Sequence, residues 1–171
     1  MNFDDLKKII KGDVETGDEV LEKYSHDASI FVVRPKVVVF PKDSADICAL
    51  VKWVNENKVN DPTLSITARC AGTCMSGGSI NESIILDMSL YMVGIGKITK
   101  VNEMSYGHKV AGYITALPGT FYRDFEKVTL AENLIMPSYT ASKELCAVGG
   151  MVWCVVQRGV EPRCDWLGGS D

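Results

Sequence analysis

The spacing of apolar residues along the first part of the chain predicts a short helix, a buried strand and a second helix. Near the start, four apolar side chains share one face of an amphipathic helix that ends at Gly12: Phe3, Leu6, Ile9 and Ile10. A β-branched run between Pro35 and Pro41 then predicts a buried strand. After Asp43 or Ser44, either of which can cap a helix, apolar residues recur at helical spacing: Ala45, Ile47, Cys48, Leu50, Val51 and Val54.

The rest of the chain predicts further strands and one more helix. Residues 64–67 alternate as a second strand, and residues 83–88 have the pattern of a third. Residues 97–101 and 110–117 predict an antiparallel pair. The helix that follows has its apolar face at three positions: Phe121, Phe125 and Val128. This order predicts an α+β fold without internal repeats.

Composition and charge narrow the class of protein. Apolar residues make up 46% of the chain and charged residues 23%, and no apolar run could span a bilayer, so we expect a soluble fold. The formal net charge is -4 and the basic residues are scattered, which argues against a nucleic-acid partner. The N-terminus lacks a secretory pattern, so we expect a cytoplasmic protein with no transmembrane segment.

The six cysteines predict neither a disulfide framework nor a metal site. They are irregularly spaced, and none forms a C-x-x-C pair. Only His26 and His108 could add histidine ligands. Buried or incidental thiols therefore explain the cysteines better than zinc binding does.

The segment from Arg69 to Ser79, directly after the second predicted strand, is the most informative part of the sequence. From Gly72 to Ser79 it holds three glycines and three hydroxyl side chains. Glycine tolerates positive φ and close backbone approach, so such a loop can turn several amides toward one phosphate. A plain turn rich in glycine and serine remains the alternative.

Two common phosphate-binding motifs do not fit this loop. Gly78 stands where the motif G-x-x-x-x-G-K-[S/T] requires lysine, which argues against a nucleoside triphosphatase. The fingerprint G-x-G-x-x-G of a Rossmann dinucleotide site is also missing. A nucleotide-binding protein of another α/β class stays open, although the missing lysine weakens it.

Several segments together resemble a family of flavoproteins. The run from Arg69 to Gly78, followed by Ile84 to Ser89, is similar to the signature R-G-A-G-T-x-x-S-G-G and hydrophobic-D-[L/M]-S. That signature marks the FAD-binding (PCMH-type) domains of the vanillyl-alcohol oxidase / p-cresol methylhydroxylase superfamily. Further segments look like its glycolate and D-lactate dehydrogenase branch: Tyr24 to Ser29, Pro35 to Pro41, Pro118 with Gly119, Pro137 to Ser142, and Val148 to Met151.

The resemblance implies a two-lobed domain that holds FAD between its lobes. It divides the chain into an N-terminal helical segment (1–34), a first α/β lobe with the pyrophosphate loop (35–95), the start of a second α+β lobe (96–152) and an atypical tail (153–171). The FAD is expected to be non-covalent, because the loop contains no histidine. The implied cofactor-binding residues are Cys70, Ala71, Gly72, Thr73, Cys74, Ser76 and Gly77 in the loop, with Pro118, Gly119, Ala141, Ser142, Gly149 and Gly150 beyond it.

The resemblance also implies a flavin-dependent oxidoreductase whose small-molecule substrate is a 2-hydroxy acid such as D-lactate or glycolate. The sequence identifies neither the catalytic base nor the electron acceptor. The alternative function is a catalytically inactive fragment that keeps only a flavin- or nucleotide-binding lobe.

Two loop residues and the tail depart from the family pattern. Cys70 stands where the family usually has glycine, so a positive φ there would cause strain. Cys74 replaces a side chain that hydrogen-bonds better. We interpret the tail from about Trp153 as foreign to the fold, which would leave the domain incomplete at the C-terminus.

Overall fold

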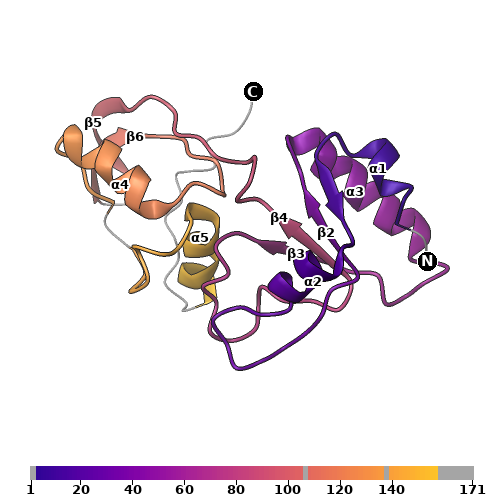
Figure 1. The fold of residues 1–171 in the computed structure, drawn as a ribbon. Coiled ribbons are helices and arrows are strands. Elements are labelled where there is room, and N and C mark those ends of the chain that lie inside the picture. The colour runs from indigo at the N-terminus through magenta and orange to yellow at the C-terminus, as the bar shows by residue number, and fades with distance from the viewer. Residues whose placement is uncertain (1–2, 106–107, 137–138, 158–171) are drawn as a thin grey trace.

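The computed structural model describes residues 3–105, 108–136 and 139–157, which form two groups of helices and strands (Figure 1). The first group contains α1 (Leu6–Ile9), β1 (Asp13–Glu15), α2 (Asp18–Tyr24), β2 (Val37–Phe40), α3 (Ser44–Asn57), β3 (Ile66–Arg69) and β4 (Ile84–Asp87). The second contains β5 (Thr99–Ser105), β6 (His108–Tyr113), α4 (Tyr122–Ala131) and α5 (Val148–Gln157). The predicted α+β class is confirmed. No helix within these ranges has the length and apolar character that crossing a membrane requires.

The first lobe is built on a four-stranded sheet with the order β1-β2-β4-β3. β2 and β3 both run parallel to β4, and β1 pairs antiparallel with β2. β4 therefore lies between the two strands that α3 connects. Since parallel strands end at the same edge of a sheet, the loops that follow β2, β3 and β4 all begin at that edge.

Alternating side chains of the two central strands fill a core on each face of this sheet. On one face, residues of β2 and β4 pack with α1 and α3: Val37, Val39, Ile84 and Leu86 with Leu6, Ile10, Leu50 and Val54. On the other face, Val38 and Ile85 pack with α2. Because successive residues of a strand point to opposite faces, the two β-branched runs are buried on both sides.

Two carboxylates hold the start of α3 and the turn before β1. Asp43 is the N-cap of α3, as the sequence predicts, and it accepts the N–H of Asp46 at 3.0 Å. The buried Asp46 carboxylate accepts three backbone N–H groups, from Lys11, Gly12 and Lys42. These bonds satisfy a buried charge and tie the N-terminal segment to the loop after β2.

The N-terminal segment contributes a strand that the sequence does not predict. Residues 1–34 are expected to be helical, but β1 lies between α1 and α2 and pairs with β2 over three residues. The segment is thus part of the first lobe's sheet.

The second lobe has a smaller core, and the buried face of its helix α4 differs from the predicted one. The sequence places Phe125 and Val128 on the buried face, but the structure buries Tyr122, Phe125 and Thr129, whereas Val128 is 39% exposed. The helix begins one residue later than predicted, because Phe121 is its N-cap. The buried positions then follow the i, i+3, i+7 spacing from Tyr122.

Candidate functional site

The loop from Cys70 to Gly78 follows β3 directly, at the edge where the parallel strands end. It turns at two glycines in the left-handed region, with φ of 65° at Gly72 and 78° at Gly77. Among the described residues other than glycine, only Asn133 has a positive φ. Cys70 therefore does not carry the strain considered from the sequence.

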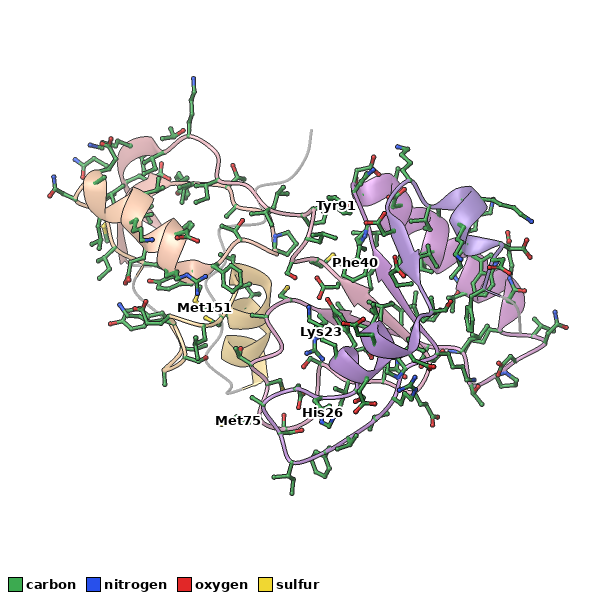
Figure 2. The ribbon with its side chains drawn as sticks, in the orientation of Figure 1. Lys23, His26, Phe40, Met75, Tyr91 and Met151 are labelled. Carbon is green, nitrogen blue, oxygen red and sulfur yellow. The ribbon has the colours of Figure 1, made fainter. Side chains whose placement is uncertain are left out.

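The centre of this loop presents backbone donors. Within the described part of the chain, the amides of residues 71–75 have no hydrogen-bond acceptor. Thr73 and Ser76 add hydroxyl groups beside them. Figure 2 shows Met75 at the lower edge of the first lobe, on the side toward α5. A run of unsatisfied N–H groups suits an anion that accepts several of them at once.

Cys70 links the loop to the second lobe. Its Sγ donates to the carbonyl oxygen of Pro118 at 3.4 Å, and a methyl group on Gly149 would lie 3.1 Å from the same sulfur. Burial, with a smaller effect of the Asp87 carboxylate, raises the pKa of Cys70 to about 11. The side chain is therefore a neutral thiol at physiological pH and not a reactive thiolate.

Cys74 organises the second half of the loop. Its Sγ lies 3.3 Å from Oγ of Ser76. Partial burial raises the pKa of Cys74, but the Ser76 hydroxyl and the nearby backbone amides of Ser76 and Gly78 lower it by a larger amount, so the net pKa lies below the ordinary value.

A segment after α2 holds the loop near both of its ends. The N–H of Ala28 donates to the carbonyl oxygen of Gly72 at 3.1 Å. The hydroxyl of Ser79 donates to Asp27 at 2.9 Å. Residues 24–29 are among the segments that resemble the family, but the sequence alone does not pair them with the loop, because 52 residues separate the two partners of the second contact.

Asp27→Ala is expected to loosen the loop in a pH-dependent way. Partial burial raises the pKa of Asp27, but hydrogen bonds from Ser29 and Ser79 together lower it by a larger amount. The net pKa of Asp27 in the folded chain therefore lies below its ordinary value. Such a carboxylate stabilises the fold above its unfolded-state pKa, and the contribution is lost as the pH falls through the folded-state pKa. The variant should therefore lose more stability at about pH 7 than at about pH 3.

Chemical denaturation of the wild type and Asp27→Ala at both pH values measures this difference. Ser79→Ala removes one hydrogen bond without changing the charge, so it should reproduce part of the loss at neutral pH. Equal losses at the two pH values would contradict the role of the Asp27 charge.

Four of the implied residues of the second lobe lie beside the loop or the end of β4. The N–H of Gly149 donates to the carbonyl oxygen of Pro118 at 2.9 Å, and the backbone of Gly150 lies close enough to Cys70 to lower the pKa of its thiol slightly against the effect of burial. Gly119 packs against the turn that follows β4. These contacts hold the start of α5 against the first group of elements, and Figure 1 shows α5 on the side of the second group that faces the first.

Ala141 and Ser142 lie in the turn before α5. Ser142 has its Oγ 3.3 Å from the hydroxyl of Thr140, and its carbonyl oxygen accepts the N–H groups of Leu145 and Cys146. Within the described residues, no hydrogen bond joins either residue to the loop. Their part in cofactor binding stays a prediction.

The geometry assigns no catalytic or metal-binding role. In the part of the chain that the structure describes, no three His, Cys, Asp or Glu side chains gather as a metal site would require. His26 is exposed and lies 3.4 Å from Glu22.

The two lobes define a PCMH-type FAD-binding fold. The solved structure of 4-ethylphenol oxidase from Gulosibacter chungangensis in its isoeugenol complex matches with a TM-score of 0.65 at 15% identity, over 86% of this chain and 27% of that one. Residues 35–168 match the family described as FAD binding domain, and the chain belongs to that family. FAD is accordingly its cofactor.

Two curated relatives are named as dehydrogenases. D-2-hydroxyglutarate dehydrogenase of Haemophilus influenzae is 34% identical over 94 residues, which make up 54% of this chain and 9% of that protein. D-lactate dehydrogenase of Anaerostipes hadrus is 27% identical over 149 residues, 86% of this chain and 28% of that protein. The chain thus spans only a minor part of the length of these relatives, and it resembles flavin-dependent oxidoreductases at the level of the family.

The family match extends into the predicted tail. It ends at residue 168, and α5 continues to Gln157, beyond the expected boundary at residue 153. Residues 158–171 lie outside the described residues. The interpretation of the tail as foreign to the fold stays a prediction.

Proposed function

We propose that this chain is the FAD-binding part of a flavin-dependent dehydrogenase that acts on a small 2-hydroxy acid. The observation that carries the proposal is the loop after β3. There, two glycines with positive φ accompany five successive amides that have no acceptor among the described residues. The loop also lies at the carboxyl edge of parallel strands, where sheets of this kind bind ligands.

The loop residues fit the diphosphate of FAD. The amides of residues 71–74 would donate to the phosphate oxygens, and the hydroxyls of Thr73 and Ser76 would add donors. Backbone donors can hold a diphosphate without a lysine, which agrees with glycine at position 78. Since the loop has no histidine, we expect the FAD to be held without a covalent bond to it.

Residues of the second lobe would complete the FAD-binding site. A methyl group on Gly149 would lie 2.9 Å from Cβ of Pro118, so the two backbones approach more closely than side chains allow. This approach keeps the start of α5 next to the loop. Ala141, Ser142 and Gly150 would extend the contact surface along the cofactor.

Bound FAD supplies a flavin ring that accepts a hydride, while the protein binds and orients it. The relatives' names suggest D-2-hydroxyglutarate or D-lactate as the substrate class. The residues assigned above hold the diphosphate. The group that removes the substrate's hydroxyl proton is expected outside this set.

The short span of the chain favours a second candidate, a flavin-binding chain without turnover. The chain covers 9% and 28% of the two relatives. We expect this chain alone to bind FAD and not to oxidise a hydroxy acid.

A thermal-shift titration of the purified chain with FAD, FMN and ATP tests the binding proposal. FAD should raise the melting temperature most, because FMN lacks the diphosphate bridge and ATP lacks the flavin. No stabilisation by FAD would contradict the proposal, and equal stabilisation by ATP would favour a general nucleotide site. Reduction of an artificial electron acceptor with D-lactate or D-2-hydroxyglutarate then separates an active chain from an inactive one.

A further inference from the structure

Arg69, the last residue of β3, places a cation beside the loop that the proposed function does not use. A methyl group on Gly72 would lie 2.6 Å from Nη2 of Arg69, so the guanidinium lies directly against the backbone of this glycine. Nη1 donates to the carbonyl oxygen of Ser79 at a long 3.4 Å. The guanidinium thus contacts the loop near its start and just after its end.

Among the described residues, Arg69 forms no ion pair within 4.0 Å. Its register partner on β4 is Asp87. The Asp87 carboxylate instead accepts the N–H and the hydroxyl of Ser89, both at 2.6 Å.

The guanidinium of Arg69 also lies over an aromatic ring. Cζ of Arg69 lies 5.0 Å from the ring centroid of Tyr24, a cation–π distance. Such a contact stabilises the cation and leaves its net charge in place. A partly buried cation without an ion-pair partner attracts an anion more strongly than an exposed one does.

We propose that Arg69 supplies the positive charge that draws the FAD diphosphate to the loop, a role that rests on the proposed function. Where a P-loop carries lysine, this loop has Gly78, and the cation comes from the end of the strand instead. Arg69 is a positioning residue. Its contacts with Gly72 and Ser79 hold the loop in place, and its charge lies beside the loop that carries the amides of residues 71–75.

The test measures FAD affinity of the full chain by isothermal titration calorimetry at about 50 mM and about 500 mM NaCl. At low salt, Arg69→Gln should bind FAD about 10- to 100-fold more weakly than the wild type, and its affinity should depend less on salt. Arg69→Lys keeps the charge but loses the planar fork, so it should bind more weakly while keeping the salt dependence.

Arg34→Gln is the matched control. It removes the same charge from the same lobe, at an arginine paired with Asp18 at 2.6 Å and Glu22 at 3.0 Å. Because these pairs are on the surface, and no hydrogen bond or ion pair among the described residues joins Arg34 to the loop, FAD affinity should change by less than about twofold.

The outcomes separate this inference from the proposed function. A wild-type chain that does not bind FAD overturns both. A wild type that binds FAD, with Arg69→Gln equal to Arg34→Gln, overturns only the role of Arg69. A loss of affinity without any change in salt dependence would contradict the charge role and leave Arg69 as a structural support alone.

If ligand-free melting shows that Arg69→Gln is unfolded, the Arg69→Lys variant decides. Retained salt dependence of its FAD affinity supports the proposal, and loss of that dependence contradicts it.

Discussion

Gly119→Ala is expected to lower the free energy of unfolding by about 3 kcal/mol and the melting temperature by roughly 6 to 12 °C. A methyl group at this position would overlap the carbonyl oxygen of Met88 and come within 2.9 Å of that of Met92. Both oxygens belong to the backbone of the turn after β4, which cannot move aside as a flexible side chain would. FAD affinity should fall as well, because Gly119 belongs to the proposed cofactor site.

Gly150→Ala is the control for this substitution. Among the described residues, a methyl group on Gly150 meets nothing within 4 Å, and alanine is the better helix former at a position in α5. Differential scanning calorimetry of both variants measures the contrast. Equal melting temperatures would contradict the close approach of Gly119 to the turn.

Gly12→Ala is expected to destabilise the first lobe by about 3 kcal/mol or more. A methyl group here would overlap the carbonyl oxygen of Phe40 and approach the amide of Lys42 to 3.2 Å. The N–H of Gly12 also donates to the buried Asp46 at 3.0 Å, so a backbone shift that relieves the overlap would break this bond.

Gly17→Ala tests whether glycine itself matters in this segment. Gly17 is the N-cap of α2 and has an ordinary φ of -69°. Within the part of the chain that the structure describes, a methyl group on it would touch no neighbour within 4 Å. Its replacement should change stability by less than about 1 kcal/mol. Urea denaturation of the two variants compares them, and a similar loss in both would argue against the overlap at Gly12.

The centre of the first lobe could be predicted from the sequence because its signals are local. The β-branched runs of β2 and β4 are buried along their whole length, and the Asp43 cap starts α3 where expected. The loop after β3 could be recognised for the same reason, since its glycines occupy the two turns with positive φ.

Contacts between distant segments could not be predicted in this way. β1 is three residues long and is stabilised by pairing with β2, and no apolar periodicity marks it. Two other contacts likewise depend on tertiary packing: the hydrogen bond from Ser79 to Asp27 and the one from Cys70 to Pro118. On α4, the buried face depends on which residue begins the helix, a boundary that propensity locates poorly.

We propose that the loop amides of residues 71–74 bind the diphosphate of FAD. Amide chemical shifts of the ¹⁵N-labelled chain, recorded during titration with FAD, test this binding most directly. We expect these amides to show the largest shifts, with smaller ones at Gly119 and Gly149. If FAD binds and leaves the amides of residues 71–74 unchanged while others shift, the assignment of this loop is contradicted.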